Sequence, residues 1–157
     1  MFDLINGIPL HPLVVHAIVV LLPLATLGTI AIAVRPRWRR PYGPLVVAAA
    51  LVATVLCPVA TSSGEQLEKR VGDPGDHAAL GDTLVWFALA LLVTSAALVW
   101  LDRRHRRTDE AGRPTLLNVV AVVAVVVALA SAVQVYRVGD SGARAAWGDA
   151  ASSSSGD

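Results

Sequence analysis

The sequence has little with which to build a catalytic site of a familiar kind. Only one of its 157 residues is a cysteine, Cys57, so no intrachain disulfide can form, and this residue is interpreted as a small core side chain. The chain contains no cysteine-pair motif, no glycine-rich phosphate loop and no nucleophile beside a base. The sequence therefore gives no positive support for an enzyme.

Charge is also scarce, which argues against a soluble domain. Charged residues make up 16% of the chain and hydrophobic residues 55%, and the mean hydropathy is +0.61. A membrane-spanning helix needs about 20 predominantly apolar residues. Four runs meet this length: residues 12–34, 43–60, 83–101 and 116–136. The first run is not typical of a cleaved signal peptide, because the only charged residue before it is the acidic Asp3 and an arginine-rich segment follows it.

The connections between these runs are short, so consecutive helices should be antiparallel neighbours. The sequence predicts an all-α integral membrane four-helix bundle formed by residues 1–149, followed by a disordered, serine-rich tail at 150–157. Alanines spaced four residues apart are expected to form close helix–helix packing faces. They are Ala49 and Ala53 in the second run and Ala124, Ala128 and Ala132 in the fourth.

Lysine and arginine are distributed unevenly between the two sides of the predicted bundle. Residues 35–41 and 102–114 carry nine basic residues and three acidic residues. The remaining segments outside the helices carry four basic residues and nine acidic residues. Basic loops are retained in the cytoplasm, so the N-terminus and the C-terminus are both expected on the outer face. The arginine runs are interpreted as topology signals that also contact anionic lipid, and not as nucleic-acid-binding segments.

Local signals predict where the helices begin and end on the outer side. Pro12 is tolerated in the first helical turn, where its missing N–H needs no partner. Residues 62–65 resemble a capping box, which predicts that a short external helix begins there. The third helix is expected to begin near Pro74. The fourth is expected to break at Gly139–Gly142, with Trp147 beyond it as an interfacial anchor.

Polar residues gather at all four outer helix ends. They are His11, His16, Glu65, His77, Asp82, Gln134 and Asp140. Ionisable groups at membrane depth are costly and mark functional sites by default, although the cost is lower at the interface. The fourth histidine, His105, lies in an arginine-rich loop and is interpreted as part of a solvated basic patch.

Two contacts within this outer cluster are predicted. His16 and His77 should approach one another across the first and third helices, because both lie within about two turns of the same membrane surface. Asp82 should pair with Arg137, directly or through Asp140, because each would be costly at the membrane boundary without a partner.

Three interpretations of the outer cluster stay open. Imidazole and carboxylate groups suit zinc or copper, and the ligands would come from His11, His16, His77, Glu65 and Asp82. A b-type haem could instead be held by His16 and His77, with His11 as a substitute. The third interpretation is a structural polar network. His11 and His16 lie about 140° apart around a helix, so they share a face only if the helix start is distorted.

Four short motifs in order resemble a bacterial family known as a domain of unknown function (DUF 2231). The first helix begins with His11-Pro-Leu-Val-Val-His16, similar to the HPLxVH motif of that family. Ala60–Glu65, His77–Asp82 and Arg137–Trp147 look like its remaining blocks, although some branches carry histidine at the position of Asp140. The resemblance implies four transmembrane helices in the bacterial cytoplasmic (inner) membrane and no established activity.

Two functional hypotheses follow. In the first, the protein is a non-enzymatic haem- or metal-binding electron-transfer subunit, and a looser similarity to small four-helix haem b membrane proteins is the reason for including haem. In the second, it is a structural or accessory subunit whose small-residue faces pack against a larger membrane complex. Both hypotheses place the chain in a lipid bilayer, with other membrane subunits as candidate partners.

Overall fold

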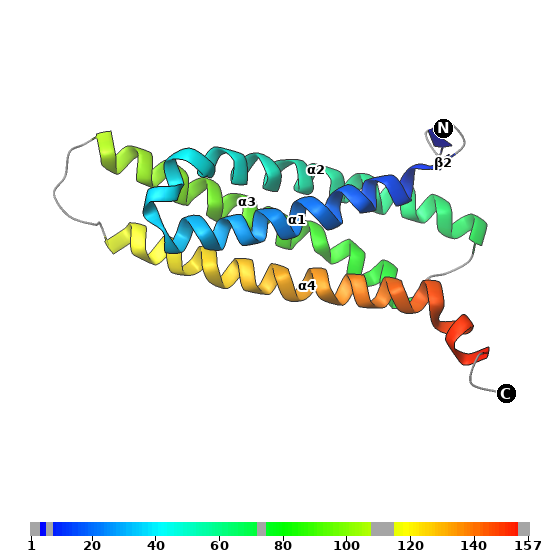
Figure 1. The fold of residues 1–157 in the computed structure, drawn as a ribbon. Coiled ribbons are helices and arrows are strands. Elements are labelled where there is room, and N and C mark those ends of the chain that lie inside the picture. The colour runs from blue at the N-terminus through cyan, green and yellow to red at the C-terminus, as the bar shows by residue number, and fades with distance from the viewer. Residues whose placement is uncertain (1–3, 6–7, 72–74, 108–114, 154–157) are drawn as a thin grey trace.

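Four long helices lie side by side in the computed structural model (Figure 1). The structure describes residues 4–5, 8–71, 75–107 and 115–153, and side chains within 11–69, 75–107 and 115–144. The elements are β1 (Leu4–Ile5), β2 (Ile8–Pro9), α1 (Leu10–Val34), the 3₁₀ turn η1 (Pro36–Trp38), α2 (Arg39–Val71), α3 (Asp76–Arg107) and α4 (Thr115–Ser153). The two strands pair in a minimal antiparallel hairpin before α1.

All four helices are long and apolar enough to cross a membrane. The candidate spans are His11–Val34, Pro36–Lys69, Asp76–Arg107 and Thr115–Arg144, with mean hydropathies of 2.5, 2.2, 2.3 and 2.8. A spanning helix needs about 20 such residues. The prediction of an all-α, membrane-spanning four-helix bundle is confirmed.

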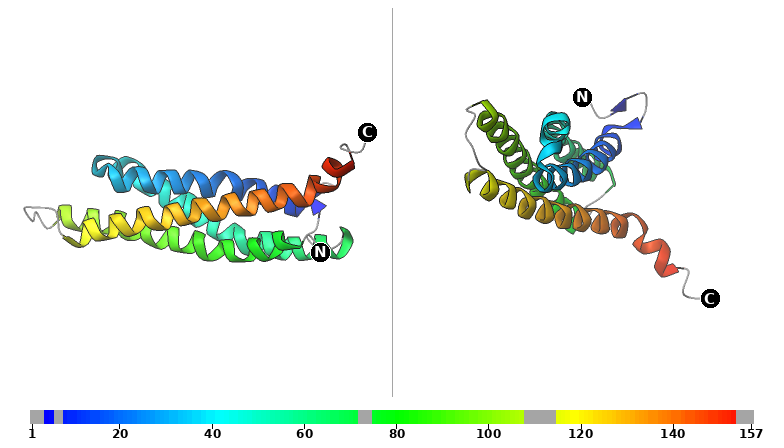
Figure 2. Two further views of the ribbon diagram at one scale, coloured as in Figure 1. Left: turned by 90° about the horizontal axis from the view of Figure 1, so that it is seen from below. Right: turned by 60° about the vertical axis from the view of Figure 1, so that its left-hand side comes forward.

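The helices run alternately up and down, so the bundle has two distinct ends. Each helix packs against the next in the chain, α1 also packs against α4, and α1 and α3 meet across the centre. The end where α1 and α3 begin and α2 and α4 finish is called the termini end, because both chain termini lie there (Figures 1 and 2). The opposite end carries the arginine-rich connections and is called the arginine end.

The core is built from small and aliphatic side chains, while large apolar side chains cover the outside. Leu22, Ala25, Leu91 and other core residues are fully buried. Exposed residues such as Val126, Leu129 and Val133 give the surface the apolar character that a lipid environment favours. Much of the apolar surface of the bundle therefore stays exposed, and this surface is suited to contact with the hydrocarbon interior of a bilayer.

Small residues permit close approach between helices, as the alanine spacing indicated. Ala49, Ala53, Ala124 and Ala128 are all buried, but Ala132 is exposed, so the predicted packing face on α4 ends before it. A Cβ atom added to Gly28 would lie 2.6 Å from Val46 Cγ2 on α2, and one added to Gly43 would lie 2.7 Å from Val99 Cγ2 on α3. These two glycines are the closest fits of backbone against a neighbouring helix.

Two predicted helix boundaries at the termini end are wrong. No separate external helix begins at residues 62–65, because α2 continues without a break to Val71. Ser62 donates to the Pro58 carbonyl, so its hydroxyl is satisfied within the helix instead of capping a new one. Helix α4 likewise passes through Gly139–Gly142 and reaches Ser153, inside the expected tail 150–157. Pro74 lies outside the described residues, and α3 is described from Asp76.

A buried ion pair closes the arginine end. Arg39 is 4% exposed and Asp102 is 6% exposed, and their side chains lie 3.3 Å apart. Arg39 also donates to the carbonyls of Ile32, at 2.8 Å, and Ala33, at 3.0 Å, which are near the end of α1. Asp102 in addition accepts from Arg106 at 2.8 Å. Arg39, grouped with the topology signals in the sequence, is therefore a structural cap that joins α1, α2 and α3.

Candidate functional site

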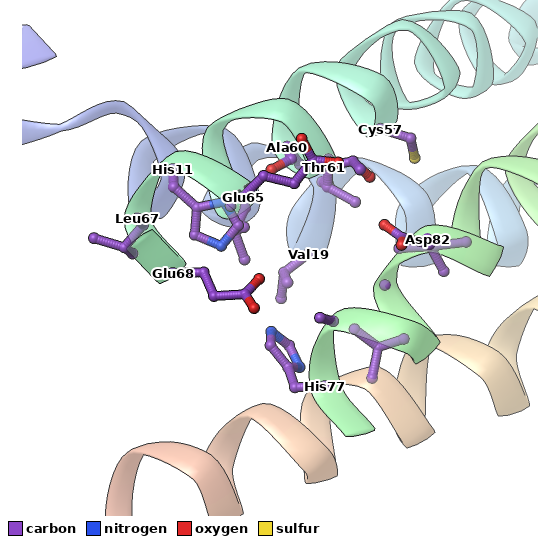
Figure 3. Close-up of a pocket in the computed structure, with 17 residues that line it drawn as sticks. His11, Val19, Cys57, Ala60, Thr61, Glu65, Leu67, Glu68, His77 and Asp82 are labelled. Atoms are coloured by element: carbon purple, nitrogen blue, oxygen red, sulfur yellow. Dashed lines mark hydrogen bonds between the residues drawn. The ribbon is translucent and has the colours of Figure 1, made fainter. Parts of the chain in front are cut away.

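A pocket of about 450 Å³ opens between the helices at the termini end (Figure 3). Helices α1, α2 and α3 supply nearly all of its lining, and α4 contributes Val138. Apolar side chains form its deeper wall, including Ile18, Leu84 and the buried Cys57. Among the described residues, the titratable members of the lining are His11, Cys57, Glu65, Glu68, His77 and Asp82. A mainly apolar concavity with a few converging polar groups is the usual form of a ligand site.

His11 enters this pocket from the first turn of α1 and is anchored to α2. Its Nδ1 atom lies 2.9 Å from the Ala60 carbonyl oxygen and 3.2 Å from Ser63 Oγ. A carbonyl oxygen can only accept a hydrogen bond, so Nδ1 must carry the hydrogen. In the neutral form of the ring, Nε2 then carries the lone pair and can bind a metal ion or accept a hydrogen bond. The ring lies against Gly64, where an added Cβ would be 3.1 Å from Cε1.

His77 enters from the first turns of α3 and is anchored to α4. Its Nδ1 atom lies 3.2 Å from Ser141 Oγ, and Ser141 donates its own hydrogen to the Val138 carbonyl at 2.9 Å. The serine oxygen therefore accepts from His77, which again assigns a hydrogen to Nδ1, so that Nε2 carries the lone pair in the neutral form of the ring. The His77 ring lies against Gly142, where an added Cβ atom would be 2.9 Å from His77 Cε1.

Three carboxylates accompany the two imidazoles, and none of the lining residues that the structure describes is a lysine or arginine. Glu65 and Glu68 come from α2 and Asp82 comes from α3. In Figure 3 the Glu68 carboxylate lies between the two imidazoles and points toward His77. Sequence reasoning missed Glu68, although it follows Glu65 by three residues and so shares its helix face. The described lining therefore carries three acidic side chains and no lysine or arginine.

The predicted partner of His77 lies elsewhere. His16 is exposed and is not part of the pocket lining, and its Nδ1 donates to the Pro12 carbonyl at 2.6 Å within α1. His11 takes the place beside the pocket instead. The rotation of α1 decides between them: Val14 and Ile18 are buried, which turns His16, two residues beyond Val14, toward the outside.

The described residues contain no ion pair between Asp82 and Arg137. Both are exposed, and Asp82 belongs to the pocket lining. Asp140 accepts instead from Arg144, one turn further along α4, at 2.6 Å. Gln134 is buried and donates to Thr83 Oγ1 at 2.7 Å, which ties α4 to α3 just below the pocket. Helix geometry favours the local partner, because residues four apart face each other on α4.

No metal centre is preformed in the part of the chain that the structure describes. Within it, no three histidine, cysteine, aspartate or glutamate side chains converge closely enough to hold a metal ion. His11 and His77 lie on the same pocket with their Nε2 lone pairs unclaimed by the hydrogen bonds given above. The site is therefore a mainly apolar pocket with a few titratable side chains, in which side-chain rotation would have to complete any coordination shell.

Fold and pocket together define a class: a small polytopic membrane protein with a histidine- and carboxylate-lined cavity at one end of a four-helix bundle. A family model described as "Predicted membrane protein (DUF2231)" matches residues 7–154, nearly the whole chain. The protein belongs to this family, as the four sequence motifs indicated. No curated protein and no solved structure was found to match the chain.

Proposed function

We propose that this protein binds a divalent metal ion in the termini-end pocket, with His11 and His77 as nitrogen ligands and Glu65, Glu68 and Asp82 as the source of oxygen ligands. One observation carries the proposal: two imidazoles whose Nδ1 atoms are held by hydrogen bonds share a pocket with three carboxylates, and the described lining contains no lysine or arginine. Nitrogen and carboxylate oxygen together suit zinc, copper(II), iron(II) and manganese. The second hydrogen bonds of the two rings are of the kind that orient metal-ligating histidines.

We expect side-chain rotation to complete the site when a cation binds. Glu65 and Glu68 are long side chains on one face of α2, and Glu68 already lies between the two rings (Figure 3). A cation would remove the mutual repulsion of the carboxylates, which favours their convergence on it. The hydrogen bonds of His11 and His77 involve Nδ1, so Nε2 is the ring atom that each histidine would offer to a cation.

The composition of the pocket favours a metal ion over haem. A haem carries two propionates, and three carboxylates around it would repel them. Of the two histidine pairs considered for haem, His16 with His77 loses support because His16 is exposed and outside the described pocket lining, and the substitute pair, His11 with His77, lies among the carboxylates. An electron-transfer role follows only if the bound ion is copper or iron, since zinc does not change its oxidation state.

The competing hypothesis is a structural or accessory subunit without a ligand. It is favoured by the protein partners that already satisfy the Nδ1 atoms of His11 and His77. In that case the pocket residues would merely close the bundle. Under either hypothesis we assign the protein to the bacterial cytoplasmic membrane, with the pocket facing outward as the arginine distribution favours.

Zinc binding by the purified protein in detergent separates these alternatives. We expect a single zinc site that His11→Ala, His77→Ala and Glu68→Gln each weaken by at least about 10-fold. His16→Ala is the matched control, because this exposed histidine of α1 lies outside the pocket, and it should leave the affinity unchanged. A visible spectrum is recorded on the same sample. A Soret band would replace the metal proposal with haem, and the absence of zinc, copper and haem binding would overturn it in favour of the structural hypothesis.

A further inference from the structure

The two pocket histidines are held in the same way by different helical hairpins. In α1–α2, His11 Nδ1 lies 3.2 Å from Ser63 Oγ, and in α3–α4, His77 Nδ1 lies 3.2 Å from Ser141 Oγ. Each serine donates its own hydrogen to the carbonyl three residues earlier, at 3.0 and 2.9 Å. Each ring rests on the glycine that follows the serine. We call these sets the first clasp (His11, Ser63, Gly64) and the second clasp (His77, Ser141, Gly142).

The equivalent residues of the two clasps give an alignment of one hairpin with the other that is chosen without reference to burial. His77 follows His11 by 66 positions, and Ser141 follows Ser63 by 78. With the first offset, six buried residues of α1 align with buried residues of α3: Ile18 with Leu84, Leu22 with Ala88, Ala25 with Leu91, Thr29 with Ser95, Ile32 with Leu98 and Ala33 with Val99.

The second offset gives the same result for α2 and α4. Buried residues align again: Arg39 with Leu117, Val46 with Ala124, Ala50 with Ala128 and Ala53 with Ser131. Ala60 aligns with Val138, and both line the pocket. Over residues 11–34 and 39–64 against 77–100 and 117–142, no buried position of one hairpin aligns with an exposed position of the other. Because burial played no part in choosing the offsets, this agreement is an independent test of them.

We infer that the bundle is an internal duplication of one helical hairpin, and that the two clasps are equivalent devices that present the Nε2 atoms of His11 and His77 to one ligand at the interface between the repeats. Ser63 and Ser141 are then positioning residues. The ligand part of this inference rests on the proposed metal site, whereas the duplication and the histidine tautomers stand on the contacts alone.

Duplication explains why the pocket lies where it does. Helices α1 and α3 both begin at the termini end, so the repeats are parallel and are related by an approximate two-fold axis along the bundle. Such an axis brings the two clasps to the same end and to opposite sides of the central α1–α3 contact. Membrane proteins built from repeats commonly bind their substrates at the repeat interface.

The acidic residues break this symmetry. Glu65 of α2 aligns with Ala143 of α4, and Asp82 of α3 aligns with His16 of α1. The carboxylates that line the pocket therefore have no counterparts on the other side of the axis, and the histidines are the duplicated element. A bound cation would be held by a symmetric pair of nitrogens and a one-sided set of oxygens, which accounts for a lining drawn mainly from α1, α2 and α3.

The histidine tautomers provide a test that needs no metal. In nitrogen-15 spectra of histidine-labelled protein in detergent, assigned by single histidine variants, we expect His11 and His77 with hydrogen on Nδ1. Ser141→Ala should release His77 into a mixture of tautomers. Ser63→Ala should have a smaller effect on His11, whose Nδ1 retains the Ala60 carbonyl. Ser62→Ala is the matched control, since this neighbouring hydroxyl bonds to the Pro58 carbonyl, and Ser141→Thr should restore the wild-type spectrum.

Zinc titration of the same variants completes the test. Ser141→Ala should weaken zinc binding about 10-fold or more, as loss of an outer partner of a ligating histidine does, and Ser141→Thr should recover it. A neutral His11 or His77 with its hydrogen on Nε2 in the wild-type protein, or an unaffected His77 in Ser141→Ala, would overturn the clasp inference whatever zinc does. The expected tautomers without zinc binding would leave the clasps standing and reject the metal site.

Discussion

Arg39 and Asp102 form an ion pair at the arginine end, although they lie in α2 and α3, 63 positions apart, and both are almost fully buried. Arg39 simultaneously donates to two carbonyls near the end of α1. Three helices therefore meet at one guanidinium group. Its planar set of donors allows this, whereas a lysine would present a single ammonium.

Breaking this ion pair should destabilise the bundle. We expect Asp102→Ala to lower the free energy of unfolding in detergent by about 3–5 kcal/mol, because it removes a carboxylate from a buried ion pair. Arg37→Ala changes an exposed arginine of the same segment and should have little effect. Thermal unfolding of both variants measures the difference. Equal stability of the two would show that Asp102 does not hold Arg39.

Close packing at one glycine gives a second prediction. Gly43→Ala should cost about 1–3 kcal/mol, because the added methyl would lie 2.7 Å from Val99 Cγ2 on a branched side chain that cannot turn away freely. The control is Gly139→Ala in α4, where nothing lies within 4 Å of the added atom. There, alanine should stabilise the helix slightly, because glycine loses more backbone freedom on folding. Opposite signs of the two shifts in melting temperature are expected.

The exposed acid and base at the termini end give a third prediction. Asp82 and Arg137 share no ion pair among the described residues, so the effects of Asp82→Ala and Arg137→Ala on stability should add in the double variant. By contrast, Asp140→Ala and Arg144→Ala remove the two sides of one exposed i,i+4 pair and should be coupled by a few tenths of a kcal/mol. Coupling between Asp82 and Arg137 well above this would show that they interact in detergent.

The sequence was sufficient to predict the number of helices and the membrane class, because these depend on length and apolar content alone. It could not predict the rotation of α1, since an almost wholly apolar helix gives no periodic signal for its buried face. The choice of His11 over His16 depends on that rotation. For the same reason Arg39 could not be distinguished from its exposed neighbours Arg37 and Arg40.

Local motifs at the termini end failed for a different reason. Ser62 and Gly64 fit a helix start, but hydroxyl groups can also bond to carbonyls within a helix, and only the neighbouring helix decides between these outcomes. Gly64 and Gly142 are present because imidazole rings lie against them, and the chain continues as a helix through both. A glycine near a helix end therefore marked a packing contact here and not a break.

The internal duplication was invisible in the sequence. Aligned over residues 11–34 and 77–100, α1 and α3 share only His11/His77, Val19/Val85 and Ala31/Ala97. Apolar residues replace one another freely in a membrane interior as long as volume and helix phase are kept. Only the shared hydrogen bonds of the two clasps set the register that makes the repeat evident.

The orientation of the bundle is the last prediction, and it decides whether the pocket opens to the outside. The arginine end carries Arg35 over the Trp38 ring at 5.0 Å and Arg104 over the Trp100 ring at 5.4 Å, an arrangement suited to a membrane interface. Since basic segments stay in the cytoplasm, the termini end should face outward. In a Cys57→Ala background, which removes the single native thiol, an impermeant maleimide applied to intact cells should label Ala150→Cys and leave Arg40→Cys unlabelled until the cells are lysed. Labelling of Arg40→Cys in intact cells would invert the topology and place the histidine pocket on the cytoplasmic side.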